Sequence, residues 1–245
     1  MVEVTPSRVL EAAARAAVPE TGADPAALQK LLLWLSPAFP VGSYAYSHAL
    51  EWAIEDGSVT TSDALGEWLA AILQHGAGRS DAILLAHAWR ARGLALREIA
   101  ELAAALQPSR ERHLEATAQG AALLAAVASA WPSAALAAAT AEVGVVAVTY
   151  PVAIAIAAAA HGVPLAATLT AYLTTFAANI ASAGVRAIPI GQSAGQKVIA
   201  ALAPLIATIA TAAQTASLDE LGGAALRADI ASMKHETQYT RLFRS

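Results

Sequence analysis

A long stretch that almost lacks charge restricts how this chain can fold more than any other feature. Between Thr117 and Ser217 the only formally charged side chains are Glu142, Arg186 and Lys197. Such a stretch cannot cover an ordinary water-exposed surface, because about a quarter of the residues in a typical soluble domain are charged. It must therefore be buried in the fold, in a partner protein or in lipid.

Burial in lipid is the least favoured of these three possibilities. The segment Val143–Gly184 carries no formal charge and exceeds the roughly 20 apolar residues that a membrane-spanning helix needs. However, Pro151, Gly162 and Pro164 interrupt it, and much of it is alanine. Leu, Ile, Phe and Val drive insertion. We therefore expect Ala-rich helices in a protein core and no membrane partner.

Composition excludes several classes of function. The 245 residues include no cysteine, which rules out a disulfide framework, thiolate zinc sites and thiol catalysis. A net charge of −4 argues against nucleic acid as a partner, because phosphate binding requires clustered Lys and Arg. Charges are scattered through the first fifteen residues, where a secretory signal would have an apolar segment, so a cytoplasmic location is expected.

The pattern of apolar residues, Gly and Pro predicts an all-α, single-domain helical bundle. Asp24 followed by Pro25 is a strong helix start, and Leu28, Leu31, Leu32 and Leu35 have the spacing of one apolar helix face. Further helices are expected at 44–56, from Ser62, and at 80–92, 96–106, 109–130 and 191–213, the last broken or bent at Pro204, and Ser217 is expected to open a final helix with a capping box. Only 145–148 and 187–190 alternate as short strands would. We expect an N-terminal extension at 1–23, a helical domain at 24–233 and a tail at 234–245.

One motif is typical of serine hydrolases. Gly191-Gln-Ser193-Ala-Gly195 matches G-x-S-x-G, and Asp219 or Asp229 and then His235 follow in the order of that catalytic triad. The motif requires a strand before it and a sheet around it, which the pattern does not predict. The alternative is that its small residues let two helices approach closely.

Two short groups could begin a metal site. His48 and Glu51 are three residues apart and would share one helix face, and His235 precedes Glu236 near the end of the chain. A stable site needs three or four ligands, and spacing fixes no third one. A structural polar cluster is the alternative interpretation.

Two segments have the composition of binding surfaces. Trp34, Phe39, Tyr44, Tyr46 and Trp52 crowd one loop and helix, and such aromatics are as consistent with a core as with an interface. The tail 234–245 combines aromatic residues with cations, so we expect it to fray when free and to order on binding.

Three blocks of this sequence resemble the UreF family of urease accessory proteins. They are residues 35–51 (LSPAFPVGSYAYSHALE), 184–196 (GVRAIPIGQSAGQ) and 235–245 (HETQYTRLFRS). The resemblance covers most of the chain from Leu31 onward, although Ala45, Ala49 and Ala194 are smaller than expected. It implies an all-α homodimer without catalytic activity.

The resemblance also implies a function and partners. Members of the family act as chaperones in nickel insertion into urease, between a UreD/UreH-type scaffold and a UreG-type GTPase, and deliver the assembly to apo-urease. The residues that it implies for the GTPase-facing or dimer interface are Pro40, Gly42, Tyr44, Ser47, His48, Glu51, Arg186, Pro189, Gly191, Gln192 and Gln196. Those that it implies for scaffold docking are His235, Glu236, Tyr239, Arg241, Leu242 and Arg244.

Two further expectations rest on the resemblance. Arg186 could act on the phosphate of the GTPase and so gate GTP hydrolysis, or it could form an interface salt bridge. No cofactor is expected to bind tightly. Nickel in transit would find weak ligands in His48, Glu51 and His235.

Overall fold

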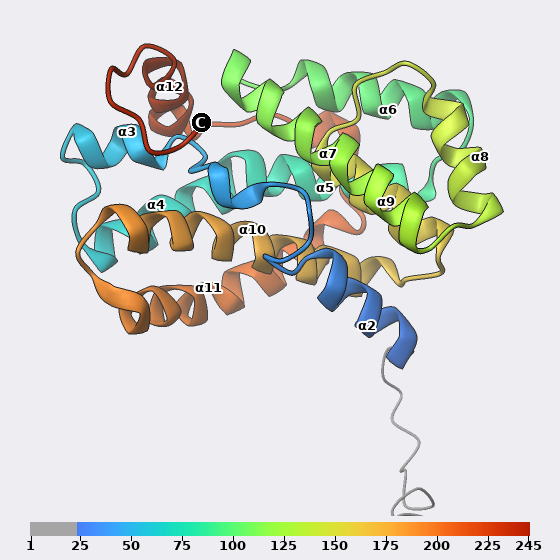
Figure 1. Ribbon diagram of the computed structural model, residues 1–245, viewed down its shortest axis with the longest axis horizontal. Helices are drawn as coiled ribbons and strands as arrows, with labels where there is room; N and C mark the ends of the chain where they lie inside the picture. Colours follow the sequence, from blue (N-terminus) through green and yellow to red (C-terminus); the bar gives the residue numbers. More distant parts are fainter. Residues whose placement is uncertain (1–23) are drawn as a thin grey trace, which may run out of the picture.

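The chain is helical over all the residues that the structure describes. The computed structural model describes residues 24–245, which form eleven α-helices and two 3-10 turns and contain no strand (Figure 1). The elements are α2 Pro25–Trp34, η1 Ser43–Ala45, α3 Leu50–Glu55, α4 Ser62–His75, α5 Ala77–Arg90, α6 Leu94–Ala105, α7 Arg110–Ala130, α8 Ala134–Val143, α9 Tyr150–Ala160, α10 Leu165–Ala187, α11 Gly191–Ala213, η2 Leu218–Glu220 and α12 Leu226–His235. The predicted all-α class is confirmed, and the expected extension at 1–23 lies outside the described residues.

Side-chain caps fix where several helices begin. The Asp24 carboxylate accepts a hydrogen bond from the Ala26 amide, and Ser109 caps α7 in the same way through the Arg112 amide. The cap of α4 is Thr61, one residue before the predicted Ser62. The predicted capping box at Ser217 is present, but it encloses η2 and not the last helix.

The helix predicted at 44–56 is wrong, because the backbone breaks in its middle. His48 and Ala49 have φ angles of 57° and 64°, in the left-handed region that a right-handed helix cannot contain. The segment therefore divides into η1 and α3. His48 lies before α3, so it does not share a helix face with Glu51.

The charge-poor stretch supplies the centre of the molecule. Helix α9 is buried along most of its length and packs against α5, α7, α8 and α10 (Figure 1). Small side chains allow this packing: a Cβ on Gly120 of α7 would lie 2.1 Å from the carbonyl oxygen of Val148. Burial within the fold therefore accounts for α9 and for the inner face of α10.

Helix α11 is apolar but only partly covered. It runs beside α10 along one edge of the molecule (Figure 1) and is the one described helix long and apolar enough to cross a membrane. A third of its most apolar stretch is buried, and Lys197 and Pro204 lie within the helix. Its inner residues pack on α4, α5 and α10, and of the two predicted effects of Pro204 the break is absent, because the helix continues through this residue.

Helix α2 sits at the edge of the bundle and contacts α10 (Figure 1). Leu31 and Leu35 are buried as predicted, but Leu28 and Leu32 are exposed. Trp34, which was not predicted on this face, attaches the helix to the bundle, because its ring is fully buried against Trp131 and His161.

Candidate functional site

Arg186 joins three segments that are far apart in the sequence. It donates hydrogen bonds to the carbonyl oxygens of Ser182 (3.2 Å) and Tyr44 (2.8 Å). Its guanidinium also stacks 3.8 Å from the centre of the Tyr44 ring and 4.5 Å from that of Phe243. The arginine therefore ties the η1 turn and the C-terminal tail to α10. In this arrangement it neither extends outward, as a catalytic arginine would, nor forms a salt bridge within residues 24–245.

Glu51 holds the tail against the body of the protein. Its buried carboxylate accepts hydrogen bonds from the backbone amides of Leu242 (2.6 Å) and Phe243 (3.0 Å), and its Oε2 lies 3.1 Å from Nε2 of His235. The Arg244 amide donates to the carbonyl of Ala45 at 2.8 Å. The expectation that the tail frays is therefore wrong: backbone hydrogen bonds fix it in place.

The start of the tail is fixed to the N-terminus of α7. His235 is fully buried, with Nδ1 2.6 Å from Glu111, and Arg241 donates to the other oxygen of that carboxylate at 2.6 Å. The Glu236 carboxylate accepts a hydrogen bond from the Arg110 amide at 2.8 Å. This contact lies at the N-terminus of α7, where the helix dipole favours a negative charge. These contacts explain the acidic and basic residues that surround the end of the chain.

Other residues of the tail point away from the body. The Tyr239 side chain is fully exposed, and the exposed fraction of Leu242 is 73%. Arg244 is exposed as well. The tail therefore has one anchored side and one free side, and on the free side Tyr239 and Arg244 are of residue types enriched at binding hot spots.

The expected nickel ligands do not come together. Glu51 and His235 are neighbours, but the His48 ring lies beside Glu115, with 3.9 Å between Nδ1 and Oε1. Both ring nitrogens of His235 already face carboxylates. Within residues 24–245 no three His, Asp or Glu side chains are arranged to hold a metal ion. The left-handed turn at His48 is the physical reason for the separation.

A buried polar cluster surrounds His48. Arg112 donates to Glu115 on the next turn of α7, and Tyr172 donates to Asp81 at 2.7 Å. Burial lowers the pKa of His48 to about 4, with a further contribution from Arg112, so the ring is neutral at pH 7. Burial also raises the pKa of Asp81 to about 6. The cluster is thus held together by the buried Arg112–Glu115 ion pair and by the hydrogen bond from Tyr172 to Asp81.

The pKa of Glu115 shifts in the opposite direction to that of Asp81. Burial alone would raise the pKa of Glu115, but the Arg112 guanidinium and the His48 ring lower it to about 2.

The sequence analysis did not identify Asp81, Arg112 and Glu115 as members of a polar cluster. The three-residue spacing of Arg112 and Glu115 on a predicted helix was the available signal for a pair.

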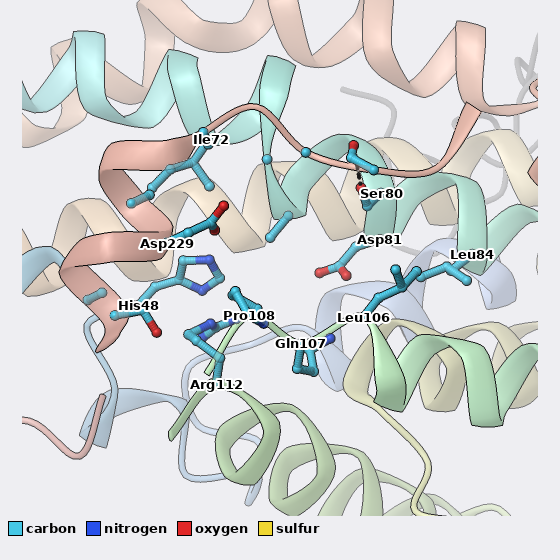
Figure 2. A pocket seen from close by; sticks show the side chains of 18 residues that line it. His48, Ile72, Ser80, Asp81, Leu84, Leu106, Gln107, Pro108, Arg112 and Asp229 are labelled. Atoms are coloured by element: carbon cyan, nitrogen blue, oxygen red, sulfur yellow. Dashed lines mark hydrogen bonds between the residues drawn. The ribbon is translucent and has the colours of Figure 1, made fainter. Parts of the chain in front are cut away.

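A cavity of about 120 Å³ opens beside this cluster. The side chains of His48, Asp81 and Arg112 point into it from the η1–α3 connection, α5 and α7, and Asp229 of α12 closes another side (Figure 2). Burial raises the pKa of the Asp229 carboxyl group. Polar side chains of the cluster therefore form one part of the cavity wall, and apolar residues such as Ile72, Leu84 and Leu106 form another part.

A second hollow lies on the surface and contains several predicted interface residues. This groove, of about 230 Å³, is lined by Tyr44, Arg186, Gln192 and Gln196 together with smaller residues of α10 and α11. Ser47 and Glu51 are buried and bonded to the tail, and His48 is buried beside Glu115. Pro40, Gly42, Pro189 and Gly191 do not line the groove. The structure therefore brings only four of the eleven residues predicted for that interface to this surface.

The structure does not support the hydrolase alternative. Ser193 lies exposed in the first turn of α11, and no strand precedes it in the described part of the chain. The close-approach alternative fits Gly195, because a Cβ there would lie 2.5 Å from a methyl group of Val185. The motif therefore serves the packing of α11 on α10.

Comparisons with known proteins agree on one family. The UreF family model matches residues 59–203. The chain is 52% identical over 233 residues to a urease accessory protein UreF of Rhodopseudomonas palustris strain BisB5, covering 94% of this chain and 96% of the relative. It is 53% identical over 226 residues to the protein of that name from Xanthobacter autotrophicus strain Py2, covering 90% and 92%. The corresponding Bradyrhizobium sp. BTAi1 protein is 51% identical over 229 residues, covering 92% and 95%.

Proposed function

Because the chain belongs to the UreF family of urease accessory proteins, we propose that it is a non-catalytic chaperone in nickel insertion into apo-urease. It acts as a single-domain homodimer that bridges a UreD/UreH-type scaffold and a UreG-type GTPase and gates GTP hydrolysis. Nickel is the cargo of the assembled complex, and this chain contributes the surfaces that hold the partners together.

The observation that carries the proposal is the convergence of the three signature blocks. Tyr44 belongs to the first block, Arg186 to the second and Phe243 to the third, and the rings of the two aromatic residues enclose the guanidinium. Because Phe243 and Tyr44 both contact Arg186, which lines the surface groove, this part of the tail lies beside the groove. One compact region could then contact two partners at once.

The exposed part of the tail is the proposed scaffold-docking element. Tyr239 and Leu242 offer apolar surface on a backbone that is already fixed, so docking need not order a free peptide. Arg244 adds an exposed positive charge beside them, whereas the charge of Arg241 is paired with Glu111. This arrangement favours a partner surface with an apolar centre and an acidic edge.

Co-purification with the scaffold tests this assignment. We expect a Tyr239→Ser, Leu242→Ser double variant to lose the scaffold while keeping its thermal stability. Leu94→Ser is the matched control, because Leu94 of α6 has a similar exposed fraction of 70%. Undiminished scaffold binding by the double variant would contradict the docking assignment.

Reconstituted urease activation tests the function as a whole. With apo-urease, scaffold, GTPase, GTP and nickel present, we expect activation to require this chain, and its addition to change GTP turnover. Activation that proceeds equally well without the chain would refute the proposal.

A further inference from the structure

The cavity beside the buried polar cluster has no part in the proposed function, yet polar side chains from three elements point into it. His48 comes from the η1–α3 connection, Asp81 from α5 and Asp229 from α12 (Figure 2). The exposed backbone of Gly222 and Gly223 forms part of the wall, so solvent can enter the cavity. We call this space the His48 cavity.

Polar groups in the wall lack hydrogen-bond partners in the described part of the chain. His48 is only 7% exposed, and its ring forms no hydrogen bond there, because the 3.9 Å between Nδ1 and Glu115 is too long. Tyr172 donates to one oxygen of Asp81 and leaves the other oxygen without a donor. The carboxyl group of Asp229 accepts no hydrogen bond either. Since buried polar groups are nearly always hydrogen-bonded, these atoms indicate a bound molecule.

Arg112 supplies hydrogen-bond donors to the same cavity. Its Nη1 donates to Glu115, whereas Nε and Nη2 have no partner within the described residues. With the His48 ring neutral, Arg112 is the one cation among the residues that line the cavity, all of which the structure describes. The wall therefore presents both donors and acceptors. A ligand that satisfies it carries an acceptor on one side and donors on another.

Size and charge restrict the ligand further. The cavity volume of about 120 Å³ exceeds the about 10–15 Å³ that one water needs, but lies below the about 300–1,000 Å³ of sites for drug-sized ligands. A cationic ligand would face the charge of Arg112, and an anionic one would face the carboxyl groups of Asp81 and Asp229. Either sign of charge thus meets a like charge in the wall. The lining suits a small molecule without net charge.

From these observations we propose that the His48 cavity binds a small, planar, uncharged molecule in which a carbonyl carbon carries an NH₂ group, such as urea or a primary carboxamide. Its carbonyl oxygen accepts hydrogen bonds from the Arg112 guanidinium. Its N–H groups donate to the free oxygens of Asp81 and Asp229, and the neutral His48 ring provides a further contact. Such a molecule reproduces the hydrogen bonds of the water that it displaces, so no polar group of the wall is left unpaired.

Three planar probes of similar size test the proposal with the full chain. Urea is neutral and has donors and an acceptor, guanidinium is a cation with donors only, and acetate is an anion with acceptors only. Each would be added at constant ionic strength up to about 100 mM, where the general contacts of urea with exposed backbone are weak and do not saturate. Amide chemical shifts of the ¹⁵N-labelled chain would report binding.

We expect urea to give saturable shifts at the amides of His48, Asp81 and Asp229. Its dissociation constant should lie in the millimolar range, because a molecule of few atoms makes few contacts. Guanidinium and acetate should bind at least tenfold more weakly than urea, because each lacks one half of the hydrogen-bonding pattern and carries a charge.

Two variants connect the shifts to the cavity. Asp229→Ala removes one acceptor from the wall, and Asp81→Asn turns a carboxylate into a neutral amide, so each should weaken urea binding several-fold. Asp63→Ala is the matched control, because Asp63 is an exposed aspartate of α4 outside the cavity. It should bind urea as the wild type does. The amide spectrum of each variant also shows whether it is folded.

Three results would overturn the inference. Urea causes no saturable shift, both cavity variants bind urea as tightly as the wild type, or guanidinium or acetate binds as tightly as urea, which would identify a charged ligand. These titrations contain this chain alone. Their failure would therefore leave the proposed contacts with scaffold and GTPase unaffected.

Discussion

Replacing Glu51 by glutamine should release the C-terminal tail, because this one carboxylate supports three contacts of the last eleven residues. Its oxygens accept the amides of Leu242 and Phe243 and face Nε2 of His235, all at 2.6 to 3.1 Å. A hydrogen bond to a charged group contributes about 1.5–3 kcal/mol, and a buried amide left without a partner costs about 1–3 kcal/mol. Glutamine keeps one acceptor and turns an NH₂ group toward the other donors. We therefore expect the tail contacts to lose about 3 kcal/mol.

Amide hydrogen exchange measures this loss directly. A loss of about 3 kcal/mol corresponds to exchange about 100-fold faster at Leu242 and Phe243, since 1.36 kcal/mol is a factor of ten. If the tail unfolds together with the body, the melting temperature should also fall by about 6–12 °C. Glu98→Gln is the matched control, because Glu98 is an exposed carboxylate of α6 outside this cluster. Exchange at the tail as slow as in that control would refute the reasoning.

Four further predictions concern the buried cluster and the backbone. Because the pKa of Asp81 is raised to about 6, the contribution of this group to folding stability is complete below pH 4 and is lost as the pH rises through 6. In urea unfolding, the Asp81→Asn variant should therefore be about 2–3 kcal/mol more stable than the wild type at pH 7 and differ little from it at pH 4. The pKa of His48 is lowered to about 4, so its contribution to folding stability has the opposite pH dependence and is lost as the pH falls from 6.5 to 4. In the same titration, the His48→Gln variant should not show that loss. Gly120→Ala should cost at least 2 kcal/mol in thermal unfolding, because the new Cβ would collide with the carbonyl of Val148, and an unchanged melting temperature would contradict this packing. Ala49→Gly should not destabilise the chain, because the φ of 64° favours glycine, and a loss above 1 kcal/mol in urea would argue against that conformation.

Local sequence patterns predicted the helices well and the functional contacts poorly. The start of α2 at Asp24 and the full extent of α11 were predictable, because caps, prolines and apolar spacing act within a few residues. The break at His48 was not, because two non-glycine residues in left-handed conformation leave no local signal. That single error joined His48 to Glu51 in a predicted metal pair that the structure separates.

The sequence alone determined that this chain is an all-helical protein of the UreF family, because helix periodicity and the three signature blocks are properties of the order of residues. Only the tertiary structure decided which residues of those blocks contact one another. Contacts such as Glu51 with Phe243 and Arg186 with Tyr44 join residues more than one hundred positions apart. No local pattern encodes such contacts, because they form only when the apolar helices α9 and α10 pack at the centre and bring the surrounding segments together.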